Sequence, residues 1–363
     1  MTDHFYAVIM AGGGGTRLWP VSRQATPKQM LKLFDNRSLF QISTERLKGI
    51  FPQKKIFVVT TSVQAKELWK QVPHLPVENY LLEPAPRGTA AVVAMAAAAI
   101  LKRDPQAVLA VLTADHFIEN VEGFQNALLA ANALAKNGYV VTLGIKPTYA
   151  ATGYGYVESG EVLGEYQGLT GYQLRRFVEK PDGARAKTFL ENNLMNWNSG
   201  MFITRADIIL AEYERLLPDL YGKLMEIRPW LGEDHSNPRF METWSSIIPQ
   251  TIDYGIMEKC NCAAVIPTRD LGWNDVGSWD SFFEVMPADE NGNIILEGKH
   301  VGLDTSNSLV VSTDPKALVV TMGMKNVIIV NTPNAVLICP RGESQHVKEI
   351  VKYLKENHYT LFL

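Results

Sequence analysis

The segment best suited to chemistry is a run of glycines followed by an arginine, at residues 11–20. It reads Ala-Gly-Gly-Gly-Gly-Thr-Arg-Leu-Trp-Pro and directly follows a short apolar stretch. Consecutive glycines let backbone N–H groups approach a phosphate closely, and Arg17 adds a charge that suits phosphate oxygens. We therefore predict a phosphate-binding loop rather than a flexible tight turn. Its members are Ala11, Gly12, Gly13, Gly15 and Thr16.

Two well-known glycine loops do not fit this segment. A P-loop requires Gly-Lys followed by Ser or Thr, which is missing here. A dinucleotide fingerprint, G-x-G-x-x-G, would place its third glycine on Arg17 or Leu18 in either register. The second mismatch disfavours an NAD-dependent oxidoreductase.

Two aspartates and two lysines are candidates for binding a metal ion and phosphate groups. Asp115 and Asp275 offer carboxylate oxygens, the ligands that Mg²⁺ prefers. Each has a structural alternative, a helix cap or loop residue for Asp115 and a turn residue for Asp275. Lys28 and Lys180 could neutralise phosphates, although a lysine alone is more often a solvated surface charge.

Several segments, in order along residues 11–279, resemble the sugar-1-phosphate nucleotidyltransferases. Trp19 together with Pro27-Lys28-Gln29 resembles the variant found in mannose-1-phosphate guanylyltransferases. The matching segments begin at Gly12, Pro27, Glu83, Thr113, Thr152, Phe177, Asn198 and Asp275. One departure is Pro86-Arg87-Gly88-Thr89, where relatives often have Gly-Arg-Asn-Thr. The resemblance is to a short form with a single activity, without the cupin-like isomerase domain of longer relatives.

The resemblance implies that mannose 1-phosphate attacks the α-phosphorus of GTP with the help of Mg²⁺, and that pyrophosphate leaves. It implies that Arg17 holds the leaving phosphates and that Lys28 neutralises the α-phosphate. The metal ligands would be Asp115 and Asp275. The nucleobase side would be formed by Glu83, Arg87 and Thr89.

The resemblance also implies a set of residues for the sugar phosphate. Lys180 would bind the phosphate, while Glu158 and Glu179 would accept hydrogen bonds from sugar hydroxyls. Asn198 would hydrogen-bond through its amide, and Gly155 would leave room for the ring. Asp253 either supports the sugar side or caps a helix, and the sequence favours neither. The implied catalytic set is Arg17, Lys28, Asp115, Lys180 and Asp275.

The strands and helices that must position these residues are expected to form a doubly wound α/β fold with a mostly parallel sheet. Strands are expected at residues 5–11, 56–60, 107–112 and 139–145, and helices at residues 38–49, 88–102 and 126–136. This alternation predicts helices on both faces of the sheet, with ligands beyond the carboxyl ends of the strands.

The rest of the chain predicts two further regions. Residues 153–280 are expected to form an irregular insertion of short strands that builds the second wall of a cleft. After residue 287, apolar clusters recur every eight or nine residues and predict a small β domain resembling a left-handed β-helix. A final helix with Val347, Ile350, Val351 and Leu354 on one face follows. The predicted domains are residues 1–286 and 287–363.

The amino-acid composition and the charge limit the classes of partner that the protein is expected to bind. A formal net charge of −3 gives no basic field for nucleic acid or an anionic membrane, so neither is expected. The N-terminus lacks the pattern of a signal peptide, and the alanine-rich run at residues 89–101 is too short to cross a bilayer. Three cysteines predict a reducing compartment, the cytoplasm. Cys260 and Cys262 are interpreted as ordinary thiols. Whether the chain forms a homo-oligomer stays open.

Two rival functions remain at this stage. One is transfer to another sugar phosphate, glucose 1-phosphate or a heptose phosphate. The other is a non-catalytic sensor of nucleotide sugars, which would have no need for a complete set of phosphate and metal ligands.

Overall fold

The computed structural model describes residues 2–13, 15–23, 25–232 and 237–363, so Gly14 of the glycine run lies outside the described residues. The chain forms two compact units that interleave along the sequence. Unit 1 comprises Met1–Gly12, Thr44–Thr113 and Glu119–Leu271, and unit 2 comprises Gly13–Ser43, Ala114–Ile118 and Gly272–Leu363. The predicted boundary after residue 286 stays a prediction.

Unit 1 is built on a nine-stranded sheet with the order β3-β2-β1-β4-β9-β6-β10-β8-β7. The strands are β1 (Phe5–Met10), β2 (Ile56–Thr61), β3 (Tyr80–Glu83), β4 (Val108–Thr113), β6 (Val140–Ile145), β7 (Tyr156–Tyr166), β8 (Leu169–Val178), β9 (Met195–Arg205) and β10 (Ala263–Thr268). All run in one direction except β8 and β9, which run the opposite way. The predicted mostly parallel sheet is confirmed.

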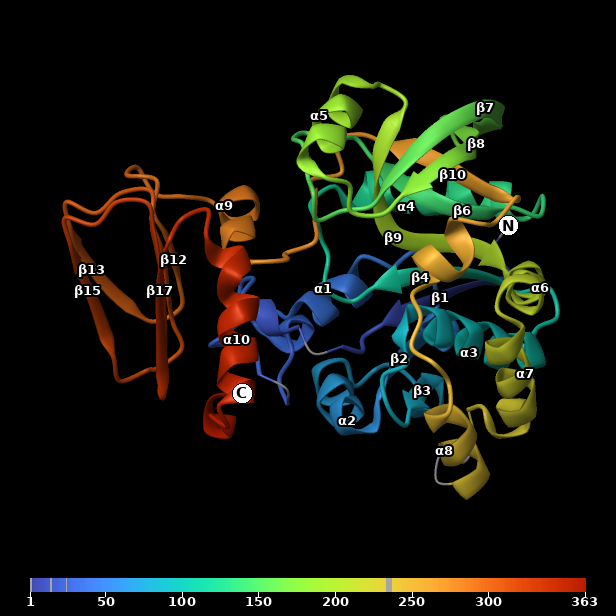
Figure 1. Cartoon of the computed structure of the whole chain (residues 1–363), viewed down its shortest axis with the longest axis horizontal. Coiled ribbons are helices and arrows are strands. Elements are labelled where there is room, and N and C mark those ends of the chain that lie inside the picture. Colours follow the sequence, from blue (N-terminus) through green and yellow to red (C-terminus); the bar gives the residue numbers. More distant parts are fainter. Residues whose placement is uncertain (1, 14, 24, 233–236) are drawn as a thin grey trace. The chain divides into compact units, whose positions relative to one another are not determined.

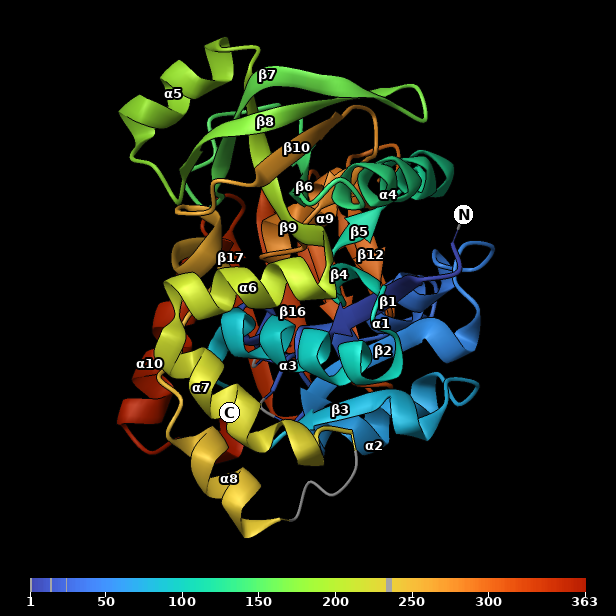
Figure 2. The ribbon, with the colours of Figure 1, turned by 90° about the vertical axis from the view of Figure 1, so that its right-hand side faces the viewer.

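Helices cover both faces of this sheet, as a doubly wound fold requires. Helices α3 (Gly88–Arg103), α6 (Ala206–Leu216) and α7 (Pro218–Ile227) lie along one side. Helices α2 (Ser62–Gln71) and α4 (Val121–Ala135) lie along the other (Figures 1 and 2). All three predicted helices are present, although α1 (Leu39–Glu45) is shorter than expected.

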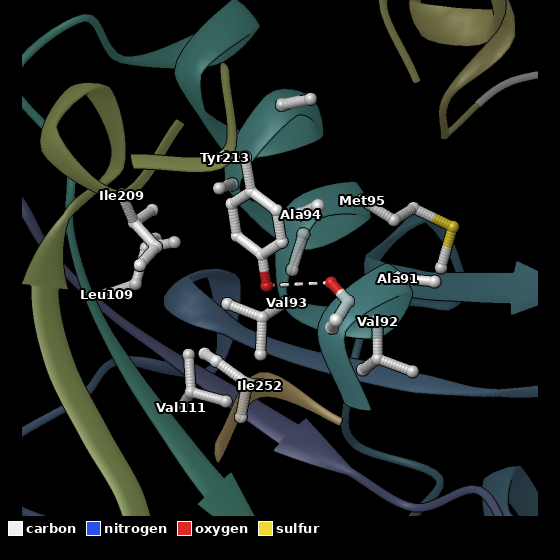
Figure 3. Packing of buried hydrophobic residues seen from close by; sticks show 14 of the residues in the cluster. Ala91, Val92, Val93, Ala94, Met95, Leu109, Val111, Ile209, Tyr213 and Ile252 are labelled. Carbon is white, nitrogen blue, oxygen red and sulfur yellow. Dashed lines mark hydrogen bonds between the residues drawn. The ribbon is translucent and has the colours of Figure 1, made fainter. Parts of the chain in front are cut away.

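The core of unit 1 is centred on α3. Its alanine-rich stretch from Ala90 to Ile100 is almost completely buried, and small side chains let α6 pack closely against it. Figure 3 shows Tyr213 of α6 inserted among these residues, where its hydroxyl donates to the Ala90 carbonyl at 2.8 Å. The interpretation of this run as a buried helix is confirmed.

The prediction of short strands in residues 153–280 was wrong. Strands β7 and β9 each have eleven residues, and the region also contains α5 (Gly183–Glu191) and α8 (Pro238–Ser245). Glycines such as Gly160 and Gly164 resemble turn signals in the sequence. In the structure they lie inside β7, whose pairing with β8 shifts register at several points.

Unit 2 contains the small β domain. Strands β12 (Ile294–Leu296), β14 (Leu309–Ser312) and β16 (Val327–Thr332) stack in parallel, and β13 (Lys299–Leu303) pairs in parallel with β15 (Leu318–Met322). Strand β17 (Ala335–Pro340) closes the stack as an antiparallel partner of β16. The expected stacked β segments are therefore confirmed.

The core of unit 2 joins this β domain to residues from the early part of the chain. Leu18, Trp19 and Phe34 share one apolar cluster with Trp279 and with the inward side chains of β12, β14 and β16. The Trp279 indole N–H donates to the Trp19 carbonyl at 3.0 Å, and the Trp19 indole donates to the Phe362 carbonyl at 2.7 Å. The glycine loop is thus anchored on the C-terminal part of the chain.

The terminal helix α10 (Val347–Glu356) packs against the same cluster (Figure 1). Val347 is buried, and Val351 and Leu354 are partly buried. Ile350 was expected on the same face but is 47% exposed and does not belong to the cluster. Within the described part of the chain, no helix is both long and apolar enough to span a bilayer.

Candidate active site

Two short strands of unit 2 bring the predicted metal ligands together. β5 (Phe117–Ile118) pairs antiparallel with β11 (Trp273–Asn274), with Asn274 opposite Phe117. Asp115 therefore lies two residues before Phe117, where β5 begins. Asp275 directly follows Asn274, where β11 ends. The two aspartates are far apart in sequence and are neighbours in the fold.

Lys28 connects both aspartate segments. Its ammonium lies 3.0 Å from Asp115 Oδ2 and donates to the main-chain carbonyl of Asp275 at 2.8 Å. Burial alone would raise the pKa of the Asp115 carboxyl, but the charges of Lys28 and His116 outweigh it and hold the pKa below its ordinary value. Asp115 is therefore ionised at neutral pH.

The Asp275 turn has a defined and strained geometry. Asn274 Oδ1 accepts from the Val276 N–H at 2.7 Å, and Asp275 Oδ1 accepts from the Gly277 N–H at 3.0 Å. Val276 is buried and has a φ of +46°, which is rare for a β-branched residue. Such strain is typical of functional turns held in place by their surroundings.

The glycine loop packs directly on the Lys28 backbone. Gly15 has a φ of +43°, and a Cβ atom there would lie 2.8 Å from the Lys28 backbone nitrogen, so only glycine fits. Thr16 and the exposed Arg17 follow in a single 3₁₀ turn, Thr16–Leu18, whose last residue is buried. Gly13 also has a positive φ, +106°. Unit 2 therefore brings together Gly15, Lys28, Asp115 and Asp275.

Glu83, at the end of β3 in unit 1, is a buried carboxylate. It is 2% exposed, and its Oε2 has no hydrogen-bond partner among the described residues. Burial raises its pKa to about 7, although a backbone hydrogen bond from Arg87 opposes the shift. Gly12 is close by, since a Cβ atom there would lie 3.0 Å from Glu83 Oε1. Ala11, at the end of β1, is buried.

The side chains of the other two residues predicted on the nucleobase side form hydrogen bonds with backbone groups of the protein. Arg87 donates to the carbonyls of Trp244 and Ser245, at 3.3 and 2.7 Å. Thr89 Oγ1 accepts from the Ile252 N–H at 3.0 Å. Both side chains therefore fasten the segment that leads to Asp253.

The predicted sugar-side residues form a polar cluster in unit 1. Lys180 donates to Glu179 Oε1 at 2.6 Å, and the Asn198 amide donates to Asp253 Oδ1 at 2.9 Å. A Cβ atom at Gly155 would lie 2.5 Å from Glu179 Oε2, so a larger residue there would displace the Glu179 carboxylate. The sequence analysis missed Thr142, whose hydroxyl donates to Asn198 Oδ1 at 2.9 Å and fixes the amide orientation.

Asp253 is not a helix cap. The short π-helical turn Asp253–Met257 has Ile252 at its N-cap, and the Asp253 carboxylate faces Asn198. Burial, together with the charge of Glu179, raises the pKa of Asp253 to about 6. Asp253 thus belongs to the polar cluster.

Glu158 faces two arginines of the neighbouring strand. Its carboxylate lies 3.0 Å from Arg176 Nη2 and 3.4 Å from Arg175 Nη1, and it is buried. These pairings follow from the register of β7 and β8, which the sequence analysis did not predict.

The donor set of unit 2 suits a hard divalent cation. Asp115 and Asp275 supply carboxylate oxygens, and a cation, the Lys28 ammonium, already lies against both segments. Carboxylates held in such a place are the usual ligands of Mg²⁺.

Comparison with known proteins agrees with this geometry. The family model described as nucleotidyl transferase matches residues 6–292, and the chain belongs to this family. A second model, the MannoseP isomerase/GMP-like beta-helix domain, matches residues 298–354.

Within this family, the chain is similar to several proteins that have a more specific name. The chain is 37% identical over 366 residues to mannose-1-phosphate guanylyltransferase 2 of Escherichia coli O157:H7, covering 98% of this chain and 75% of that one. It is also 37% identical to the mannose-1-phosphate guanylyltransferase of Klebsiella pneumoniae, with 96% and 74% covered. A crystal structure from Thermus thermophilus, described as a mannose-1-phosphate geranyltransferase, matches with a TM-score of 0.86 and 32% identity. That match covers 97% of this chain and 99% of the other.

Proposed function

We propose that this protein transfers GMP from GTP to mannose 1-phosphate and releases pyrophosphate. The family match supports nucleotidyl transfer, and the names of the relatives support guanine and mannose. The observation that carries the proposal is the cluster of Lys28, Asp115 and Asp275, which combines a cation for phosphate with two carboxylates for a metal ion.

The proposed reaction is an in-line displacement at the α-phosphorus of GTP. An oxygen of mannose 1-phosphate forms the new bond, and the bond from the α-phosphorus to the oxygen bridging to the β-phosphate breaks. The nucleophile is already ionised, so no general base is assigned. Arg17 binds the two phosphates that leave, and Lys28 stabilises charge on the α-phosphate. Lys180 binds the phosphate of the sugar.

Asp115 and Asp275 would hold Mg²⁺, which when bound neutralises the charge of the triphosphate. The same two segments orient Lys28, through the ion pair to the Asp115 carboxylate and the hydrogen bond to the Asp275 carbonyl. The lowered pKa of Asp115 keeps its carboxylate ionised for either task.

Glu83 is our candidate for recognising guanine. Guanine presents two adjacent N–H donors, at N1 and at the 2-amino group, and an ionised carboxylate accepts both. Two observations support this assignment: Glu83 is buried, and its Oε2 has no partner within the part of the chain that the structure describes. Adenine lacks this pair of donors and would leave the carboxylate unpaired, which discriminates strongly in a buried site.

The sugar preference rests on a smaller difference. Mannose and glucose differ only in the configuration of the 2-hydroxyl, so a single hydrogen bond, worth about 1–3 kcal/mol, selects between them. Glu179, Asn198 and Asp253 are the candidate partners. We therefore expect a strong base preference and a weaker sugar preference.

Pyrophosphate release tests the proposal. The protein is mixed with Mg²⁺ and each pairing of GTP, ATP or UTP with mannose 1-phosphate, glucose 1-phosphate or a heptose 1-phosphate, and kcat/KM is measured. The highest value is expected for GTP with mannose 1-phosphate. Preference for another base or sugar would remove the GDP-mannose assignment and keep nucleotidyl transfer. Binding of GDP-mannose without turnover of any pair would favour the sensor.

A further inference from the structure

Cys260 and Cys262 lie beside a third potential ligand that is distant in sequence. Their Sγ atoms are 3.1 Å apart, and a carboxylate oxygen of Glu212 completes a group whose donor atoms all lie within 4.8 Å of one another. Glu212 is in α6, whereas the two cysteines belong to the turn that leads into β10. All three residues are partly buried.

We propose that Cys260, Cys262 and Glu212 form a binding site for one soft divalent cation, of the zinc class. The site is separate from the carboxylates assigned to Mg²⁺. The proposal is independent of the function proposed above, since none of the three residues was assigned a role there.

The donor chemistry selects the class of ion. Thiolates favour Zn²⁺ and other soft ions, whereas Mg²⁺ requires oxygen ligands. Two thiolates on one tetrahedral Zn²⁺ lie about 3.8 Å apart, because each Zn–S bond is about 2.3 Å. Small side-chain rotations would widen the present 3.1 Å separation to that value. Three protein ligands leave the fourth position to water.

The charge around the site balances a divalent ion. Two thiolates and one carboxylate carry three negative charges, and the ion leaves one of them uncompensated. Arg215 supplies the missing positive charge, since its Nη2 lies 2.5 Å from Glu212 Oε2 and 3.3 Å from the Lys259 carbonyl. The arginine would orient the Glu212 carboxylate as an outer partner of the ion.

The surroundings provide both access and a rigid frame. A cavity of about 800 Å³ is lined by Cys260 and by the residues on either side of it. The Cys262 carbonyl accepts from the Val140 N–H at 2.9 Å, which ties the turn to the start of β6. A bound ion would link α6 to this turn, which closely follows the π-helical turn Asp253–Met257.

Cadmium titration tests the proposal, because cadmium–thiolate bonds give an ultraviolet charge-transfer band. The reduced, chelator-treated full chain is titrated without oxygen, and one ion per chain with a saturating band is expected. Cys260→Ser and Cys262→Ser should each weaken binding at least tenfold, and Glu212→Gln severalfold. Zn²⁺ should compete for the site and raise the melting temperature of the original chain more than that of the variants.

Two controls separate this site from others. Cys339→Ser removes the third thiol and should leave the band unchanged, as should Asp115→Asn, which alters the proposed Mg²⁺ site. A band that survives in both cysteine variants would overturn the proposal. So would the absence of a band together with loss of two thiols under glutathione disulfide, which would make the pair a redox couple.

Discussion

Glu83 carries the sharpest consequences at the scale of single residues. A carboxylate that is 2% exposed, with one oxygen that has no partner among the described residues, is costly to keep ionised, which is why its pKa rises to about 7. A ligand that donates two hydrogen bonds to the carboxylate would offset the cost of keeping it ionised. We therefore expect Glu83 to determine both the selectivity for the base and the pH dependence of that selectivity.

The Glu83→Gln variant should reduce the discrimination between GTP and ITP. Inosine lacks the 2-amino group, so the original protein should prefer GTP by about 1.5–3 kcal/mol, the value of a hydrogen bond to a charged group. A glutamine side chain accepts only one of the two hydrogen bonds, so the ratio of kcat/KM for the two nucleotides should fall about tenfold. An unchanged ratio would show that Glu83 does not contact the base.

The same carboxyl should give opposite pH trends in two measurements. The pKa is about 4.5 in the unfolded chain and about 7 in the folded one, so the stabilising contribution of the protonated form is complete below about 4.5 and is lost as the pH rises through 7. Guanine binding requires the ionised form, so the preference for GTP over ITP should grow over the same pH range. Melting temperatures and kcat/KM ratios between about pH 5 and 8 check both trends, with Glu83→Gln as the flat control.

Asp115→Asn and Asp275→Asn should each reduce kcat by more than about a hundredfold while the fold is retained. Each removes a charged metal ligand, and the first also removes the ion pair to Lys28. Circular dichroism and melting curves serve as the control for folding. Retention of more than about a tenth of kcat, equivalent to about 1.4 kcal/mol of barrier, would contradict the metal assignment.

At the scale of elements, the turn at Gly15 depends on the absence of a side chain. Gly15→Ala should lower kcat/KM for GTP at least tenfold, because its Cβ atom would lie 2.8 Å from the Lys28 backbone and displace the lysine. Gly49→Ala is the matched control, since Gly49 also has a positive φ, +92°, but has open space around it. That variant should cost about 1–2 kcal/mol of stability and leave kcat/KM unchanged.

The sequence predicted elements well where burial alone defines them. β1, β2, β4 and β6 are mostly apolar, and α3 is rich in alanine, so local composition was sufficient. β7 and β9 were missed because their glycines and asparagines resemble turns. β7 is held by the adjacent β8 and by β9, and β9 pairs with β4, β6 and β7. Tertiary contacts overrode local preference there.

The candidate site was predicted as a set of residues but not as a set of contacts. The proximity of Asp115 and Asp275 depends on the pairing of β5 with β11, and the fixing of Asn198 depends on Thr142 in another strand. Arg87 and Thr89 were predicted to face the nucleotide, yet their side chains bond the backbone at residues 244–252. Such long-range partners leave no local sequence signal.

At the scale of the whole molecule, the two side chains proposed to bind phosphate groups belong to different units. Arg17 belongs to unit 2, and Lys180 belongs to unit 1. Arg17→Ala should weaken GTP and pyrophosphate binding about tenfold or more and spare mannose 1-phosphate, since each variant removes one charge-assisted phosphate contact. Lys180→Ala should do the reverse. Titration of both ligands against both variants decides, and equal weakening of both ligands by either variant would contradict the division.

Because segments of unit 2 lie both before and after unit 1 in the sequence, the two units are completed at different times during synthesis. Residues 13–43 are synthesised long before the apolar partners of Leu18 and Trp19, which include Trp279 and Leu309. At about 5–20 residues per second, the ribosome needs about 15–60 s to add the roughly 300 residues between residue 43 and α10. The strands from β1 to β10 are complete before that. Under the proposed assignment, triphosphate binding is therefore acquired later in synthesis than the sheet of unit 1.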